Sequence, residues 1–151
     1  MRLLADTNVL LDYLLRRPGF EGPMRRVFVM QFYGAAELWA SAKSFTDVFY
    51  VARKAIGSAC AQECMLALLE QLHVCAIDGE DIRAAAQSAW PDFEDCLIAR
   101  AAEKIGADAI LTRDARGFER AAIPARTPVE LLDQVFRETG SLYDEIEFPG
   151  A

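Results

Sequence analysis

Strand-like and helix-like segments alternate along almost the whole of this 151-residue chain. Short apolar runs typical of strands cover residues 2–5, 37–41, 73–77, 109–112 and 123–125. Apolar residues recur at helical spacing in the segments between and after them, at residues 7–17, 23–33, 44–56, 59–72, 79–90, 92–105 and 128–138. Successive strands joined by a helix run parallel. The alternation therefore predicts a three-layer α/β/α sandwich, in which a mostly parallel central sheet is covered by helices on both faces.

The length indicates a single domain that is large enough to bury a substantial core. We expect residues 1–136 to form this domain and residues 137–151 to form an acidic C-terminal tail. The tail carries one basic and four acidic side chains, which gives it a net charge of −3. Three of its side chains, Tyr143, Ile146 and Phe148, are expected to pack on the domain, because a disordered tail would be less apolar.

The composition points to an ordinary globular protein of the cytoplasm. No apolar stretch approaches the ~20 residues of a membrane span, and the first residues lack a signal-peptide pattern. The four cysteines are expected to be reduced thiols, as is usual in that compartment. A zinc site is not expected, because the single histidine, His73, falls in a predicted strand.

Four aspartates lie where predicted strands and helices meet. Asp6 and Asp114 each follow a strand, whereas Asp47 and Asp95 lie just inside helices. Sites in open α/β sheets form beyond the carboxyl ends of the strands, so these four carboxylates can converge in one crevice. Converging carboxylates need a neutralising group, and a hard divalent cation is the simplest one. Asn8, close to Asp6, can hydrogen-bond a ligand or orient a carboxylate.

Each of these acids also has a purely structural explanation. Two of them fit capping boxes, in the segments Ser44–Asp47 and Asp92–Asp95, although aspartate is shorter than the usual glutamate. Asp6 and Asp114 can cap the helices that follow them. Capping does not require that all four acids lie at one edge of the sheet, so their joint placement favours a functional site. Four other acids are assigned to the solvated surface or to loops, namely Asp12, Asp78, Asp108 and Glu94.

The net charge of −7 argues against non-specific binding to nucleic acid. The tail accounts for −3 of this charge, which leaves −4 for residues 1–136, and the four candidate site acids account for that remainder. Basic residues also lie close in sequence to those acids. The overall charge is therefore a weak objection to a polyanionic substrate.

Several segments resemble the motifs of PIN-domain nucleases, in the family's order and spacing. The first is the opening Leu4–Asp12, and the next two are Asp92–Ala99 and Gly106–Asp114. The descending end, Phe118–Leu132, is also similar, so the resemblance covers about residues 1–133.

The resemblance implies a role for each candidate residue. Asp6 matches the first acid of the family and Asp95 the third. Asp114 matches the fourth, with Thr112 as the accompanying hydroxyl. Asn8 matches the polar residue beside the first acid. The best match to the second acid is Asp47, where the family usually has glutamate, so Asp47 is one methylene shorter and can act through a water molecule.

From the chemistry and the resemblance together we expect a divalent-metal-dependent endoribonuclease that hydrolyses phosphodiester bonds of single-stranded or structured RNA. A Mg²⁺ or Mn²⁺ ion would lower the pKa of its bound water and offset charge on the phosphate. Asp6 and Asp95 would be the main ligands, and Asp114 and Asp47 would complete the shell or hold a second ion. Asn8 and Thr112 would orient these groups.

The resemblance is strongest to compact VapC-type toxins, which implies a small antitoxin partner and a homodimer. The alternative is a catalytically weak PIN-fold protein that serves in binding or regulation. An aspartyl phosphatase is disfavoured because Asn8 stands where a second acid is needed, two residues after Asp6. A receiver domain is disfavoured because its acceptor aspartate would follow the third strand, where Asp78 lacks the expected neighbours.

Overall fold

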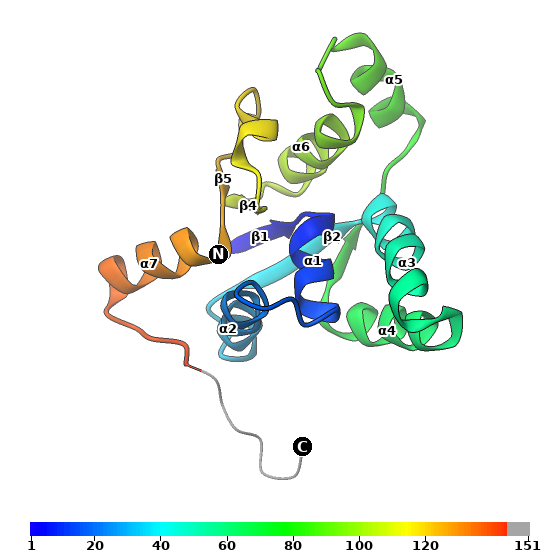
Figure 1. Ribbon diagram of the computed structural model, residues 1–151. Coiled ribbons are helices and arrows are strands. Elements are labelled where there is room, and N and C mark those ends of the chain that lie inside the picture. Colours follow the sequence, from blue (N-terminus) through cyan, green and yellow to red (C-terminus); the bar gives the residue numbers. More distant parts are fainter. Residues whose placement is uncertain (145–151) are drawn as a thin grey trace.

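The computed structural model describes residues 1–144 (Figure 1). Its sheet has the strand order β3-β2-β1-β4-β5, and every neighbouring pair is parallel. The strands are β1 (Arg2–Ala5), β2 (Glu37–Ser41), β3 (His73–Cys75), β4 (Ala109–Leu111) and β5 (Ala125–Arg126). The predicted parallel α/β fold is therefore confirmed, with β1 at the centre of the sheet.

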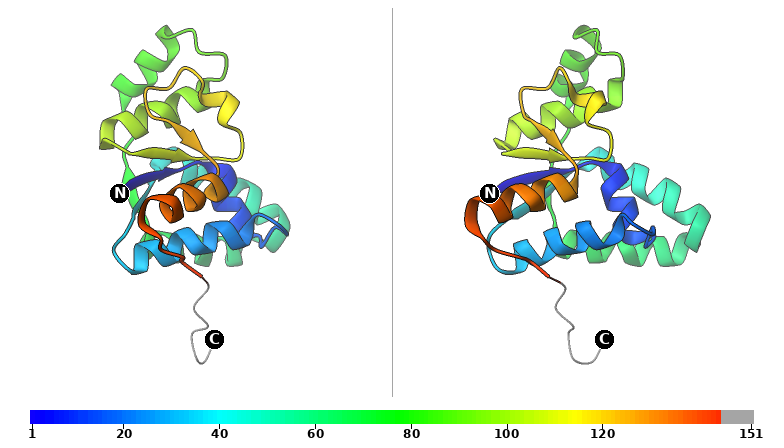
Figure 2. Two further views of the ribbon diagram at one scale, coloured as in Figure 1. Left: turned by 90° about the vertical axis from the view of Figure 1, so that its left-hand side faces the viewer. Right: turned by 60° about the vertical axis from the view of Figure 1, so that its left-hand side comes forward.

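Helices cover both faces of this sheet. The large face carries α1 (Thr7–Leu14), α2 (Glu21–Phe32), α3 (Ala42–Ile56), α4 (Ser58–Gln71) and α7 (Pro128–Thr139). The opposite face carries α6 (Phe93–Ile105), with α5 (Gly79–Gln87) and the 3₁₀ helix η1 (Ala115–Phe118) beside it. Figure 2 shows the sheet between these two layers.

Alternating side chains of the central strands build the two halves of the core. Leu3 packs into the large hydrophobic cluster under α1, α2 and α3, and Leu4 packs into the smaller one with Ile98 and Ile110. All four side chains are fully buried. Successive residues of a strand point to opposite faces, so a strand that is buried on both faces reads as a continuous apolar run.

The start of α3 differs from the prediction in a way that affects the candidate site. Ser41, with extended backbone angles, is the N-cap, and its Oγ accepts a hydrogen bond of 3.1 Å from the backbone N–H of Ser44. The predicted N-cap, Ser44, is wrong, because it lies buried inside the first turn. The capping box that was predicted to explain Asp47 is therefore absent.

Other boundaries shift by a few residues, and two further expectations can be compared with the structure. Tyr143 of the tail packs beside the large cluster, as predicted. Its carbonyl also accepts a 3.0 Å hydrogen bond from Nε of Arg26. Ile146 and Phe148 lie outside the described residues. Among residues 1–144, no helix combines the length and apolar character that a membrane crossing requires.

Candidate active site

Asp6 lies at the carboxyl end of the central strand and caps α1. Its carboxylate accepts the backbone N–H of Thr7 at 2.7 Å, and its own N–H donates to the carbonyl of Leu111 at 2.9 Å. The side chain is buried, with only 6% of the residue exposed. Asp6 therefore has the capping role expected of it, and its remaining oxygen faces one group from α1 and one from the residue directly after β4.

Thr112 and Asn8 hold that remaining oxygen in place. Thr112 Oγ1 donates to Oδ2 of Asp6 at 2.9 Å, and Asn8 Nδ2 donates to the same oxygen at 2.8 Å. The Thr112 hydroxyl in turn accepts the backbone N–H of Asp114 at 3.2 Å. One network thus joins the ends of β1 and β4 and fixes the Asp6 carboxylate. Thr112 and Asn8 therefore contact Asp6, and their role in orienting a ligand of a cation stays a prediction.

Asp95 lies in the first turn of α6, and its carboxylate does not cap the helix. The cap is Asp92, which accepts the N–H groups of Glu94 and Asp95 at 2.8 and 3.1 Å. Burial and the charges of nearby acids together raise the pKa of Asp95 to about 6. Burial is the largest cause, followed by the charges of Asp92, Asp6, Glu94 and Asp114. The structure therefore gathers Asp6, Asp95 and Asp114 in one region of negative charge.

The pKa of Asp6 is also raised, mainly by burial, while its hydrogen bonds from Thr112 and Thr7 act in the opposite direction. Two charged side chains add smaller effects, since Glu94 raises this pKa and Lys43 lowers it. Both residues therefore lie close enough to Asp6 to influence its ionisation.

Asp47 is held by a lysine one turn earlier on α3. Lys43 forms an ion pair with Asp47 and a second one, of 3.1 Å, with Glu94 of α6. Burial lowers the pKa of Lys43, but the hydrogen bonds to Asp47 and Glu94 prevail and raise it. The structure thus connects Asp47 to the other acids through the ammonium group of Lys43.

Asp114 lies at the rim of the site and also serves as a cap. Its carboxylate accepts the backbone N–H of Arg116 at 3.2 Å and lies 3.5 Å from Nε of the same residue. Its side chain is 62% exposed. Asp114 is thus the most accessible of the predicted acids that act on Asp95.

Two acids were assigned incorrectly or incompletely from the sequence. Asp12 is not on the solvated surface, because it is 1% exposed and pairs with Arg17 at 3.2 Å and Arg113 at 3.1 Å. Its position on the inner side of α1, next to the loop after β4, explains the burial. Glu94 is partly exposed as expected, with 46% of its side chain accessible, yet it adjoins the site. The only feature of the sequence that places Glu94 near the site is its position directly before Asp95.

Gly117 was not anticipated as a site residue. A Cβ atom built on it would lie closer to Oδ2 of Asp95 than real Cβ atoms approach their neighbours. The absence of a side chain at this position of η1 therefore provides the room that the Asp95 carboxylate occupies.

The donor set suits a hard divalent cation. Within residues 1–144, no three His, Cys, Asp or Glu side chains are grouped so that they hold a metal ion as they stand. Magnesium, however, keeps several waters and is usually bound through one or two carboxylates. Asp6 and Asp95 would supply those two, the space beside Gly117 accommodates the Asp95 carboxylate, and Asp92, Glu94 and Asp114 add negative charge nearby.

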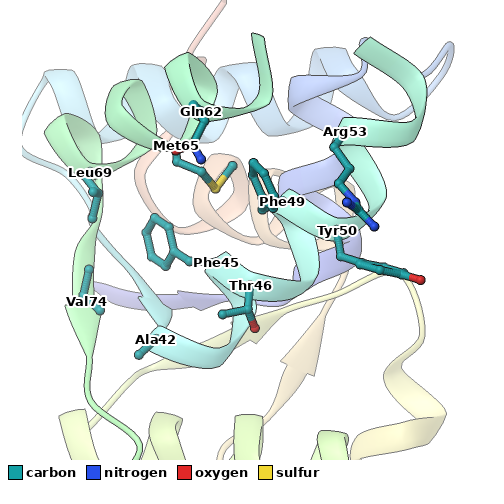
Figure 3. Close-up of a pocket in the computed structure, with 10 residues that line it drawn as sticks. All are labelled: Ala42, Phe45, Thr46, Phe49, Tyr50, Arg53, Gln62, Met65, Leu69 and Val74. Carbon is teal, nitrogen blue, oxygen red and sulfur yellow. The ribbon is translucent and has the colours of Figure 1, made fainter. Parts of the chain in front are cut away.

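A groove lies on the large face, between α3 and α4 (Figure 3). This groove of about 660 Å³ has a largely apolar lining, with Phe45, Phe49 and Met65 pointing into it. The exposed side chains of Leu69 and Val74 lie at its edge. It begins beside the site, because its lining residues Ala42 and Thr46 directly precede Lys43 and Asp47.

The fold has three layers and a parallel sheet, and several carboxylates lie beyond the carboxyl ends of its central strands. These features define a class of α/β proteins with an acidic site at the carboxyl end of the sheet. The particular family follows from the sequence, since a family model described as "PIN domain" matches residues 2–116. The chain therefore belongs to the PIN-domain family, as its motifs predicted. No curated protein matches the sequence.

Solved structures with a similar fold include a toxin and two structures named VapBC. VapC20 of Mycobacterium tuberculosis, a Sarcin-Ricin loop cleaving toxin, has a TM-score of 0.63 at 12% identity, over 80% of this chain and 95% of that chain. VapBC2 of Rickettsia felis, bound to a promoter DNA fragment, has a TM-score of 0.62 at 15% identity, over 84% and 98%. VapBC-1 of nontypeable Haemophilus influenzae has a TM-score of 0.60 at 16% identity, over 85% and 99%. At these identities the likeness establishes the fold.

Proposed function

We propose that the protein is a divalent-metal-dependent endoribonuclease with its active site at Asp6, Asp95 and Asp114. The observation that carries this proposal is the raised pKa of Asp95, at about 6, in a region that also holds Asp6 and Asp114. Asp95 has no capping role in α6, yet the fold keeps it beside like charges, and such an arrangement is typical of a site that binds a cation.

The chain's own residues would perform distinct tasks in this site. Asp6 and Asp95 would hold a Mg²⁺ or Mn²⁺ ion, with Asp114 at the rim. When bound, that ion supplies an activated water and offsets charge on the phosphate. Thr112 and Asn8 fix the direction of the Asp6 carboxylate, and supporting hydrogen bonds of this kind are worth about 10–100-fold in metal affinity or activity.

Cleavage of labelled single-stranded RNA by the purified protein tests the proposal. We expect cleavage with added Mg²⁺ or Mn²⁺, none with a chelator, and none from Asp95→Asn under either condition. Asn keeps the shape of the side chain, and the helix cap at Asp92 is untouched, so Asp95→Asn should stay folded. Asp47→Glu, which restores the usual family side chain, should retain or increase activity. If wild type and Asp95→Asn are equally inactive with metal, the binding or regulatory alternative would replace this proposal.

We further propose that the nuclease is the toxin of a toxin–antitoxin pair, because solved structures of the same fold include complexes named VapBC. Expression of wild type alone should arrest growth, whereas expression of Asp6→Asn should not. Equal growth of the two strains, with both proteins soluble, would favour a scaffold. The homodimer and the cytoplasmic location stay predictions. Light scattering of the purified protein would test the oligomeric state.

The groove between α3 and α4 is the surface we propose for an apolar segment of the antitoxin. The lining side chains are apolar, Leu69 is half exposed, and a segment that followed α3 toward its first turn would reach Lys43 and Asp47. Leu69→Glu should therefore abolish neutralisation by the antitoxin while toxicity persists. Leu66→Glu is the matched control, because Leu66 is 65% exposed on the same helix and does not line the groove.

A further inference from the structure

We propose that Phe20 and Arg113 form a stacking platform for one base of a single-stranded RNA substrate. The proposal rests on the proposed function, because it concerns how RNA is held beside the same acids. Phe20 lies outside the segments that carry the resemblance to PIN-domain nucleases, so the motifs assign it no role.

The Phe20 side chain lies on the surface, directly before α2. The residue is 47% exposed, and among residues 1–144 the hydrophobic clusters do not include it. Phe20 is the N-cap residue of α2, but its side chain forms no capping hydrogen bond. Single exposed apolar side chains are common on protein surfaces. The contacts of the ring therefore decide whether it can bind a ligand.

Arg113 contacts one face of the Phe20 ring. The guanidinium carbon of Arg113 lies 4.9 Å from the centroid of the ring. Nε of Arg113 also forms a 3.1 Å ion pair with Oδ2 of Asp12, which holds the guanidinium group in this position. Unstacked RNA bases stack on aromatic rings and on guanidinium planes. The structure therefore presents both kinds of stacking surface together, before any RNA binds.

The backbone of Arg113 connects this platform to the candidate active site. Its N–H donates to Oδ1 of Asn8 at 3.1 Å, and Nδ2 of Asn8 donates to the carboxylate of Asp6 at 2.8 Å. Arg113 therefore starts beside the contacts of Asp6, and its side chain follows α1 by one turn, from Asn8 to Asp12. A strand with a phosphate at Asp6 can thus place a nearby base on Phe20.

The charge around the platform suits a polyanion, although the net charge of the protein is −7. The two segments that carry the platform, residues 12–20 and 112–117, hold four arginines and two acids. The arginines are Arg16, Arg17, Arg113 and Arg116, and the acids are Asp12 and Asp114. The next acid, Glu21, pairs with Arg25 and leaves this excess unchanged. Local positive charge attracts the phosphates of a nucleic acid and therefore favours RNA over an apolar protein segment.

Binding of labelled RNA by the full chain tests this inference without relying on cleavage. The probe is a single-stranded RNA of mixed sequence and about ten nucleotides, within the usual site size for single strands. Fluorescence anisotropy is measured with a chelator present. We expect Phe20→Leu to weaken binding about tenfold, the scale of one lost base stack, and Phe20→Trp to bind at least as tightly as wild type. The dependence of affinity on salt should not change in Phe20→Leu, because the ring is uncharged.

Two controls separate base stacking from a general effect on the surface. Phe136→Leu is the matched variant, because Phe136 is also 47% exposed but lies in the last turn of α7, at the end of the sheet where β1 begins (Figure 2). It should bind RNA as wild type does. Duplex RNA of the same sequence is the matched probe. Its bases are already stacked, so Phe20→Leu should leave duplex binding unchanged.

The possible outcomes separate this inference from the proposed function. The inference is wrong if Phe20→Leu binds single-stranded RNA as wild type does, or if it weakens duplex binding equally. It is also wrong if wild type does not bind single-stranded RNA. In each of these cases metal-dependent cleavage by wild type would still support the nuclease. Selective loss of single-strand binding in Phe20→Leu, from a wild type that does not cleave, would support the platform and assign it to the binding or regulatory alternative.

Discussion

The Asp95 carboxylate occupies space that exists only because residue 117 is glycine. A methyl group on Gly117 would overlap Oδ2 of Asp95. Gly117 does not have a positive φ, so alanine is compatible with its backbone. A glycine is therefore needed at position 117 because of the Asp95 side chain, and not because of the backbone conformation of η1.

Gly117→Ala should displace the Asp95 carboxylate and weaken both Mn²⁺ affinity and RNA cleavage about tenfold, the usual scale for a lost supporting contact at a metal site. The melting temperature should change little, because the Asp95 side chain is partly exposed and can move. Gly79→Ala is the matched control, since nothing lies within 4 Å of a Cβ at that position and its φ is not positive. Equal Mn²⁺ affinity of the two variants would show that Gly117 has no role in the site.

Asp12 should be one of the most important acids for stability, because it is buried between two arginines. Asp12→Asn should lower the free energy of unfolding by about 2 kcal/mol, somewhat less than for a fully buried pair because both arginines reach solvent. Asp12 also pairs with Arg113, which directly follows Thr112, the residue that holds the Asp6 carboxylate. RNA cleavage should therefore fall as well. The control is Asp144→Asn, which removes an exposed partner of Arg26 and should change stability by about 0.5 kcal/mol or less. Denaturant unfolding measures both, and equal effects would contradict the structural role of Asp12.

The raised pKa of Asp95 predicts a pH dependence of stability in the absence of metal. The pKa of Asp95 in the folded state, about 6, exceeds the ordinary aspartate value of 3.8, so the folded state binds the proton more tightly. Stability from this group is therefore present below pH 4 and is lost as the pH rises to about 6. Asp95→Asn should unfold like wild type at pH 4 and be more stable by about 1 kcal/mol at pH 7, after allowance for solvent screening.

Denaturant unfolding at the two pH values, with a chelator present, checks this difference. Other carboxyl groups contribute to both proteins and cancel. Added Mn²⁺ at pH 7 should reverse the order and make wild type the more stable protein, because only wild type keeps both main ligands. A difference between the proteins that does not change with pH would contradict the placement of Asp95 among like charges.

The fold was predictable because one physical pattern, apolar strands alternating with amphipathic helices, extends along the chain. The ends of the elements were less predictable. Ser41 and Ser44 are both good caps, and only the backbone angles at Ser41 decide between them. Asp12 reads as an exposed helix residue until Arg17 and Arg113, five and about a hundred positions away, are seen to enclose it.

The site was predictable in part for a similar reason. Asp6, Asp95 and Asp114 follow from the rule that sites form beyond the carboxyl ends of parallel strands. Glu94 and Gly117 could not be found in this way, because their roles depend on which side chains the tertiary fold places opposite them. Lys43 is the clearest example, since its contact with Glu94 joins two helices far apart in the sequence.

Crystals of the protein soaked in Mn²⁺ offer the most direct test of the central claim, that these acids hold a catalytic cation. Anomalous scattering locates the ion independently of any model of the side chains. We predict an ion bound to the carboxylates of Asp6 and Asp95, with water filling most of the remaining positions. A soaked crystal with no ion at Asp6 and Asp95, or with ions only at other acids of the surface, would contradict the account.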